Sequence, residues 1–425
     1  MKTKLNLAVA AALLAGVTSA NAGIMIPAGD WTLDIGGIVN TYYTHTNASG
    51  DQHGAGYGGT FFGGTNEVLG GGTDNSQSNI TTGLLPNYLS VSGKTRQNDL
   101  DVGFTISINP GSSTRNAGAQ SLQGVGSAAF QENRQAFLTF GDKSWGSIKL
   151  GKDLGIFASD AILNDMTLLG VGSGAGGLAG NTTTLGRIGT GFMYADWKSQ
   201  IAYSSPNWNG FSFTAGVTQA WNAIAVGAGN AGGLGFDSAT SGLRGGSSPA
   251  FEGKASYEWA GDVGGKVWVS GMTQKVEGFG VGISDDRADA IDIGATVNVA
   301  GFGLTGYYYT GNGIGQTVQL NHGFDPLGKS RDSDGYYVQA TYTLPGVGTK
   351  LGLSYGRSVL DGNRADLVLD KLEDSMWTVG AYHPLTKHLN LVAEYSDVKS
   401  DFNRKALSDL TGKSKTLSLG AIMFF

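Results

Sequence analysis

The sequence predicts an all-β fold, a transmembrane antiparallel β-barrel of sixteen strands with long extracellular loops. Three observations support this prediction. Apolar and polar residues alternate along most of the chain, short and long connections alternate between the apolar runs, and aromatic residues gather beside the short connections. Outer-membrane barrels combine an even number of strands with tight turns at one end, longer loops at the other and aromatic girdles.

The composition excludes several other classes of protein. Glycine accounts for 71 of the 425 residues. Charged residues make up 15%, well below the ~25% of an ordinary soluble domain. An aromatic content of 10% with so few charges excludes a disordered chain. The absence of cysteine excludes thiol catalysis and disulfides, and a net charge of −6 without a basic block argues against nucleic acid as a partner.

The first 22 residues predict a cleaved secretory signal peptide. Lys2 and Lys4 precede an apolar stretch at residues 5–17, and Ala20-Asn21-Ala22 has the small residues of a cleavage site. An uncleaved anchor helix is the alternative, but the stretch is too short to span ~30 Å of hydrocarbon. We therefore expect a mature chain of residues 23–425 that forms one barrel domain.

The predicted strands rest on a period of two. In residues 98–109, Leu100, Val102 and Phe104 alternate with polar or small residues, so one face of the strand is apolar and the other polar. A soluble β-sandwich would give the same alternation, so this pattern alone does not decide. Comparable runs start near residues 31, 87, 99, 134, 146, 198, 211, 251, 265, 290, 302, 335, 349, 375, 388 and 414.

The lengths of the connections favour a barrel, because a sandwich has no reason to separate short from long ones so strictly. Closing the sheet also removes the unpaired edges that lipid could not satisfy. The short connections centre on Thr95-Arg96, Gly141-Asp142-Lys143, Pro206-Asn207, Gly261-Asp262, Ala300-Gly301, Pro345-Gly346 and Leu385-Thr386. The long ones cover residues 45–86, 110–133, 153–197, 220–250, 273–289, 311–334, 358–374 and 396–413.

Aromatic residues stand beside the short connections, at the height expected for the periplasmic interface of a membrane barrel. A hydrophobic core that happens to end in aromatic residues is the alternative. The residues are Trp31, Trp145, Trp208, Trp259, Phe302, Tyr342, Tyr382 and Phe425.

The sequence predicts no catalytic residue, no metal site and no cofactor. Two dinucleotide-type glycine patterns, at residues 172–177 and 227–232, lie in glycine-rich loops, whereas that motif needs a strand before it and a helix after it. The five histidines do not show the spacing of zinc ligands.

Four segments, in the order that a barrel requires, resemble those of a known family. Residues 135–141 (QAFLTFG) and 145–152 (WGSIKLGK) resemble the fourth and fifth strands that lead into the family's long third loop. Residues 201–211 (IAYSSPNWNGF) and 382–387 (YHPLTK) are similar to two of its turns, and Phe425 matches its terminal phenylalanine. The chain thus resembles the general trimeric porins of the Gram-negative outer membrane, especially their proteobacterial branch.

The resemblance implies a homotrimer of barrels whose third loop folds inward and narrows the lumen. It implies a water-filled channel for passive diffusion of small hydrophilic solutes and ions, not an enzyme, and sixteen strands leave an aqueous lumen. Outer-membrane lipid, lipopolysaccharide and the barrel-assembly machinery are the other implied partners. A substrate-preferring channel is the alternative because the loops are long, and a non-conducting secreted β-protein or adhesin is the third.

Residues 153–197, the longest connection by count, are the predicted constriction. Their charged residues stand among apolar and glycine residues, which suits a loop packed inside the lumen. Asp160 and Asp165 are expected to form its acidic rim. The constriction candidates are Lys152, Asp153, Asp160, Asp165 and Arg187.

Two features depart from the family pattern. Many members carry an arginine in the second strand, where residues 87–93 of this chain have a tyrosine. Lys152 matches a basic residue that follows the fifth strand in the family. Since Lys152 shares the parity of Ile148 and Leu150, it can face the lumen only through a bulge near Gly151.

Parity assigns more charged side chains to the lumen face. Seven carboxylates stand against four ammonium groups, and charge lining a narrow pore enriches the opposite ion, so we expect a mild cation preference. Phe425 ends an outward apolar row and is the expected assembly signal. The lumen-lining candidates are Asp34, Asp99, Asp101, Lys198, Glu252, Lys254, Glu258, Lys266, Asp292, Lys350 and Glu394.

Overall fold

A computed structural model gives the structure of the chain over residues 23–50, 76–112, 133–173, 183–222, 243–278, 283–325, 327–366 and 369–425. The described residues contain no helix that is both long enough and apolar enough to cross a membrane.

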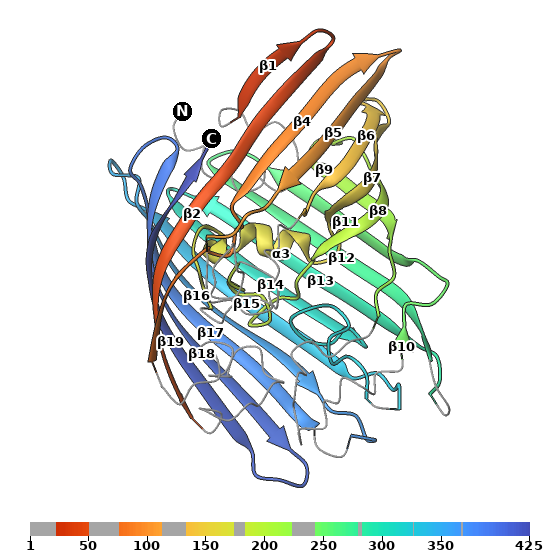
Figure 1. The fold of residues 1–425 in the computed structure, drawn as a ribbon, viewed down its shortest axis with the longest axis vertical. Helices are drawn as coiled ribbons and strands as arrows, with labels where there is room; N and C mark the ends of the chain where they lie inside the picture. Colours follow the sequence, from red (N-terminus) through yellow and green to blue (C-terminus); the bar gives the residue numbers. More distant parts are fainter. Residues whose placement is uncertain are drawn as a thin grey trace, which may run out of the picture.

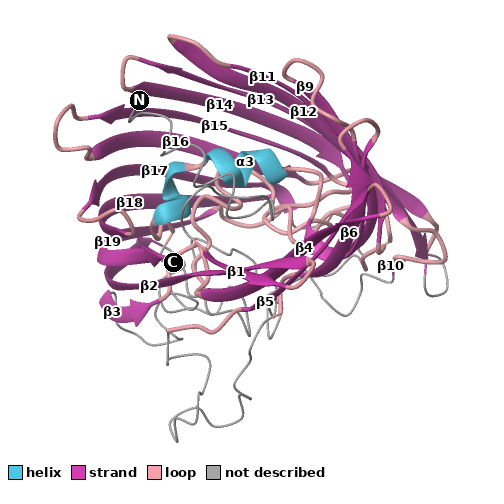
Figure 2. Ribbon diagram, turned by 90° about the horizontal axis from the view of Figure 1, so that it is seen from above, coloured by secondary structure: helices cyan, strands magenta, loops and turns pink. Residues whose placement is uncertain are grey.

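Sixteen of the described strands form a closed antiparallel ring (Figures 1 and 2), which confirms the predicted architecture. Each strand pairs with the next one along the ring, and β19 closes it by pairing with β2. In order, the strands are β2 (Trp31–Gly50), β4 (Tyr88–Gln97), β5 (Leu100–Ile108), β6 (Ala136–Asp142), β7 (Gly146–Leu154), β8 (Trp197–Ser204), β9 (Phe211–Thr218), β11 (Ala250–Trp259), β12 (Val263–Gly278), β13 (Asp286–Val299), β14 (Phe302–Asn312), β15 (Asp332–Thr343), β16 (Lys350–Asp361), β17 (Leu369–Pro384), β18 (Leu389–Arg404) and β19 (Leu410–Phe424).

Smaller elements complete the described fold. Strand β1 (Ile24–Ala28) forms a hairpin with β2, β3 (Ser76–Thr81) also pairs with β2, and β10 (Leu243–Arg244) pairs with β12. The helix α3 (Ser159–Asn164) and the 3-10 turn η1 (Met166–Leu169) follow β7. Figure 2 shows α3 inside the ring of strands, and α3 lies against β13.

The turns and strand ends correct two predictions. The turn between β4 and β5 lies at Asn98 and Asp99, whose φ angles of 48° and 63° suit a tight hairpin, and not at Thr95-Arg96. At the opposite end the strands are longer than predicted, so that β12 and β18 run into the expected connections. Beyond the hydrocarbon the outer face no longer needs apolar residues, and the period of two fades while the ladder of hydrogen bonds continues.

The outer face is apolar and the lumen face polar, as the alternation predicts. On β19, Leu417, Leu419 and Met423 point outward and are 44%, 47% and 41% exposed, whereas Thr416 and Ser418 face inward and are buried. A soluble domain buries its apolar face. This inverted arrangement is that of a barrel whose solvent on the outside is lipid.

The main apolar cluster lies inside the lumen, where the connection after β7 packs on the wall. Glycines on the wall permit this close approach. A β-carbon at Gly356 would lie 2.4 Å from the carbonyl oxygen of Thr190, and one at Gly352 would lie 2.6 Å from the sulfur of Met166. The wall therefore carries glycine where the loop backbone or a long side chain rests on it.

Candidate constriction site

The described parts of the connection between β7 and β8, residues 155–173 and 183–196, lie in the lumen and are called the inward loop here. Carboxylates of the wall hold it at two points. Glu252 of β11 accepts hydrogen bonds from the backbone N–H groups of Ile156 and Phe157 at 2.8 and 2.9 Å. Glu394 of β18 accepts those of Val171 and Gly172 at 2.7 and 2.9 Å. Charge-assisted hydrogen bonds of this kind are strong, so they fix the loop across the lumen.

Polar side chains of the wall hold the middle of the loop. Gln339 of β15 accepts a hydrogen bond from the Met166 N–H at 2.7 Å and donates one to the Asn164 carbonyl at 3.1 Å. The hydroxyl of Tyr337 donates to the Ala161 carbonyl at 2.9 Å, and that of Tyr42 to the Leu169 carbonyl at 2.7 Å. These bonds satisfy backbone groups that no secondary structure of the loop satisfies.

Asp160 lies between two lysines of the barrel wall. Its carboxylate is 3.1 Å from the ammonium of Lys254 on β11 and 2.6 Å from that of Lys266 on β12. Burial alone would raise the pKa of Asp160, but the two ammonium groups outweigh burial and lower it to about 2. Lys266 also contacts Glu258 at 3.1 Å. Asp160 thus faces the wall and neutralises part of a basic cluster.

Asp165 and Arg187 form an internal ion pair of the inward loop. Both side chains are fully buried, with 3.9 Å between Nε and Oδ1. Arg187 donates to the carbonyl of Met376 at 2.9 Å and to the hydroxyl of Ser354, which ties the pair to β17 and β16. Burial raises the pKa of Asp165 and lowers that of Arg187. The structure therefore does not place Asp165 on an exposed acidic rim.

Lys152 does not face the lumen. The β6–β7 ladder pairs Ala136 with Lys152 and Leu138 with Leu150 without a register shift, so the bulge near Gly151 is missing. Lys152 therefore keeps the outward parity of Leu150, and its ammonium donates to the Asn133 carbonyl at 3.0 Å. Asp153, one residue later, is buried on the lumen face.

Asp153 is matched by neighbours on the wall. It forms an ion pair with Lys149 of the same strand, and it accepts a hydrogen bond from the side chain of Gln135 at 3.0 Å. Its charge is therefore compensated.

Most predicted lumen-lining carboxylates also have partners. Asp292 accepts from the Ser270 N–H at 2.8 Å and from the Tyr307 hydroxyl at 3.0 Å. Glu252 pairs with the buried Lys198, and Asp101 pairs with Arg96 at 2.8 Å near the periplasmic end. Of these three carboxylates, Glu252 is the one that also binds the inward loop.

The three remaining lumen candidates, Asp99, Asp34 and Lys350, lie in different environments. Asp99 belongs to the β4–β5 turn and not to the wall. Asp34 lies beside Gly23, where a β-carbon would come within 1.7 Å of its carboxylate. The ammonium of Lys350 lies 5.3 Å from the centre of the Tyr382 ring, a cation–π contact.

A second connection also folds into the lumen, which the sequence did not predict. Residues 313–323, between β14 and β15, contain Ile314, Leu320 and Asn321, all buried. The backbone N–H of Tyr194, in the inward loop, donates to the carbonyl of Thr317 at 2.9 Å. Because the lumen accepts polar residues, the composition of this segment does not differ from that of an ordinary loop in water.

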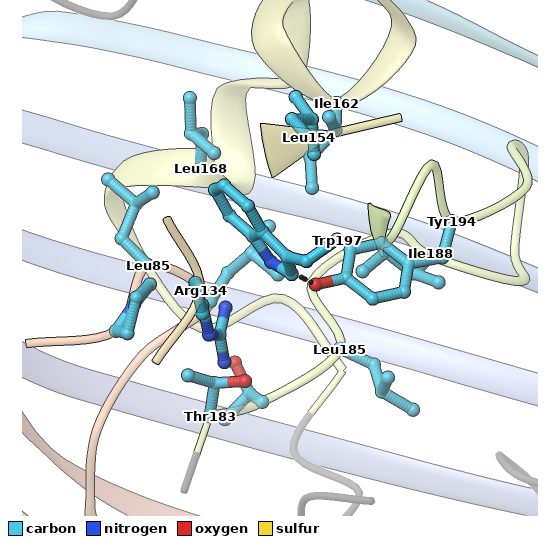
Figure 3. Close-up of a pocket in the computed structure, with 13 residues that line it drawn as sticks. Leu85, Arg134, Leu154, Ile162, Leu168, Thr183, Leu185, Ile188, Tyr194 and Trp197 are labelled. Atoms are coloured by element: carbon cyan, nitrogen blue, oxygen red, sulfur yellow. Dashed lines mark hydrogen bonds between the residues drawn. The ribbon is translucent and has the colours of Figure 1, made fainter. Parts of the chain in front are cut away.

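A pocket lies between the inward loop and the wall, and Arg134 is its charged member (Figure 3). The guanidinium of Arg134 lies 5.9 Å from the centre of the Trp197 ring. Trp197 in turn donates to the Tyr194 hydroxyl at 2.9 Å. The sequence did not indicate Arg134 as a lumen residue, because in a strand that began at residue 134 the alternation would point this side chain outward. The strand begins at Ala136, so Arg134 lies before it and does not follow the alternation. The lining includes Leu84, Leu85, Arg134, Leu154, Ile162, Leu168, Tyr194 and Trp197.

Comparison with known proteins identifies the family. The model of the Gram-negative porin family matches residues 7–403. The fold is similar to that of an anion-selective porin from Comamonas acidovorans, with 16% identity, 93% of this chain and 100% of that chain covered, and a TM-score of 0.58. It is also similar to the outer membrane channel DcaP of Acinetobacter baumannii, with 16% identity, 94% and 100% covered, and a TM-score of 0.59.

A third similar structure is that of Salmonella typhi OmpF in complex with daunomycin, with 15% identity, 95% and 100% covered, and a TM-score of 0.54. No curated protein sequence matches the chain. At these low identities the structural similarity shows a shared fold, and the family match extends over most of the chain. Family and fold point to a channel rather than an enzyme. The chain belongs to the Gram-negative porins and forms an outer-membrane channel for the passive diffusion of solutes.

Proposed function

We propose that the chain is a general porin, a homotrimer that admits small hydrophilic solutes and ions according to size. The observation that carries this proposal is that Asp160, Asp165 and Arg187, in the loop that narrows the lumen, are all engaged in ion pairs. A substrate-preferring channel would need several unsatisfied polar groups converging on one ligand. That channel is the second candidate, because two loops and not one fill the lumen.

The paired charges support weak ion selectivity in place of the cation preference that the sequence count predicts. Of the seven carboxylates, Glu252 and Asp101 form ion pairs with Lys198 and Arg96. Asp292 and Glu394 are buried in the wall and accept hydrogen bonds from neutral groups. Glu258 shares Lys266 with Asp160. Little unopposed charge then faces the passage.

We propose that the signal peptide, residues 1–22, is cleaved off after Ala22 during export. It would leave a new α-ammonium group at Gly23, directly beside the Asp34 carboxylate. An ammonium group and a carboxylate at this separation attract each other. The position of Asp34 thus supports residue 23 as the mature start, and Edman sequencing of the purified protein would test it.

Liposome swelling tests the proposed function. We expect swelling rates in reconstituted liposomes to fall smoothly as sugars grow from pentoses to tetrasaccharides, because size alone limits passage. Liposomes without protein provide the control. No swelling with any sugar would refute the channel, and one solute that enters far faster than others of its size would favour the substrate-preferring alternative.

Replacing Phe425 with Asp is expected to reduce the amount of protein in the outer membrane. Phe425 exchanges two backbone hydrogen bonds with Gly37, at 2.8 and 3.1 Å, and closes the end of the barrel. A charge at interfacial depth costs at most ~1 kcal/mol, so a large loss would reflect recognition by the barrel-assembly machinery. The measurement is the amount of heat-modifiable trimer in outer-membrane fractions.

The same variant refolded in detergent serves as the control for Phe425→Asp. It should fold nearly as well as the parent protein, since its barrel contacts change little. Unchanged surface levels of the variant in cells would contradict the prediction.

A further inference from the structure

The second segment that enters the lumen, residues 313–323, is a closed tongue. Its two ends adjoin, since a β-carbon at Gly323 would lie 2.1 Å from the carbonyl oxygen of Gly313. Within the tongue, the Gln316 N–H donates to the Asn321 carbonyl at 3.0 Å and the Leu320 N–H to the Ile314 carbonyl at 2.6 Å. It is a folded structure with its own hydrogen bonds.

The backbone of the tongue is held in an uncommon conformation. Thr317, Leu320 and His322 have φ angles of 72°, 67° and 57°, in the left-handed region that residues other than glycine rarely adopt. Three such residues within six positions persist only where the surrounding structure determines the conformation. The tongue is therefore fixed by its neighbours, and a loop exposed to water would have no cause to keep this shape.

A wall strand and the neighbouring connections hold the tongue. The amide of Gln316 donates to the Asp374 carboxylate of β17 at 2.8 Å. At the base, Arg331 donates to the carbonyls of His322 and Phe324 at 2.9 and 3.0 Å and forms an ion pair with Asp366. These contacts prevent the tongue from swinging out of the lumen as a unit.

Gln319 joins the tongue to the inward loop. Its amide nitrogen donates to the Tyr194 carbonyl at 3.1 Å, and its amide oxygen accepts from the ammonium of Lys198. Lys198 pairs with Glu252, which also binds the first residues of the inward loop. One side chain of the tongue thus contacts the return limb of the loop and, through Lys198, the carboxylate that holds the loop's beginning.

We propose that the tongue is a second constriction element of this channel, and that Gln319 is the positioning residue that keeps tongue and inward loop together. The proposal rests on the proposed channel function. The tongue contains no acidic residue, lysine or arginine, and burial together with the charge of Arg331 lowers the pKa of His322 to about 3, so His322 is neutral at pH 7. The tongue therefore narrows the passage by its volume and not by charge.

Excision of residues 314–322, with Gly313 joined to Gly323, tests the proposal. We expect the single-channel conductance to rise at least about 1.5-fold and larger sugars to enter liposomes faster. Excision of residues 406–408, exposed in the β18–β19 connection, is the control and should leave both readouts at their parent values. Heat-modifiable trimers establish that each variant has folded.

Gln319→Met tests the positioning role without shortening the chain. This variant keeps the length of the side chain but loses both amide contacts, so we expect larger fluctuations of the open-channel current with a mean conductance within about 1.5-fold of the parent value. Gln97→Met, at an exposed position at the end of β4, is the control and should not change the fluctuations.

The outcomes separate the two proposals. Parent conductance and size limit in the folded excision variant would overturn the constriction role of the tongue. If that variant does not fold, parent-like current fluctuations in Gln319→Met overturn the proposal instead. A parent protein that passes neither ions nor sugars would refute the channel function itself, whatever the variants do.

Discussion

Excising residues 156–195 is expected to raise the single-channel conductance roughly two- to threefold, because the segment that fills the lumen is removed. The structure makes the excision clean, since the N–H of Gly155 donates to the carbonyl of Asp196 at 2.7 Å and the two ends already adjoin. Conductance in planar bilayers is the measurement. An unchanged value in folded trimers would place the constriction elsewhere, with the tongue as the first candidate.

The same excision acts on the ion selectivity in two opposite ways. Glu252 and Glu394 use their carboxylates to hold the inward loop, and both are buried beneath it. Their exposure to water favours cations, whereas the loss of Asp160 beside Lys254 and Lys266 favours anions. We therefore expect only a small net change of the reversal potential. Glu394→Gln in the excised background removes part of the first effect alone and should move the reversal potential toward anions, which provides the internal control.

The strand plan could be predicted because the membrane imposes it. An outer face in contact with lipid must be apolar on every strand, so the sixteen apolar runs of the sequence correspond to the sixteen strands of the ring. The tight turns also have local signals, since Asn98 and Asp99 tolerate positive φ angles better than most residues. The predicted turn lay three residues too early, at Thr95-Arg96, because the polar residues before Asn98 occur in strands and turns alike.

The interior of the lumen could not be predicted in the same way. Its side chains bind groups more than a hundred positions away in the sequence, as the Glu394 carboxylate binds the backbone N–H of Val171, and no local pattern encodes such a contact. Parity placed Glu252, Asp292 and Glu394 on the correct face but gave no sign that they serve as hydrogen-bond acceptors for other parts of the chain. The tongue was missed because a polar lumen imposes no apolar period on a loop that enters it.

Asp160→Asn is expected to turn the channel toward anions, with the chloride-to-potassium permeability ratio rising roughly twofold. Asp160 is the carboxylate between Lys254 and Lys266, so its replacement leaves two ammonium groups with only Glu258 nearby. The carbonyl oxygen of the asparagine can still accept from Lys266, and Lys254 keeps its hydrogen bond to the Ser159 hydroxyl at 3.0 Å, which keeps α3 in place. The measurement is the reversal potential across a tenfold KCl gradient.

Because the pKa of Asp160 is low, lowering the pH of the parent protein should not reproduce the effect of Asp160→Asn. A carboxylate whose pKa is lowered to about 2 stays ionised as the pH falls from 7 to about 5, and it loses its charge only as the pH falls through 2. The parent protein should therefore not acquire the selectivity of Asp160→Asn between pH 7 and 5. A parent that becomes anion-selective in that range would show that other carboxylates set the field of the passage.

Two further variants decide whether the two lysines cause the shift. Asp262→Asn removes the same charge at an exposed turn of the barrel and should leave the reversal potential near the parent value, because salt screens charges beyond ~10 Å at 0.1 M. Lys266→Met in the Asp160→Asn background should restore most of the parent selectivity, since it removes one of the two uncompensated ammonium groups. A double variant as anion-selective as Asp160→Asn would mean that the Asp160 cluster lies away from the path of the ions.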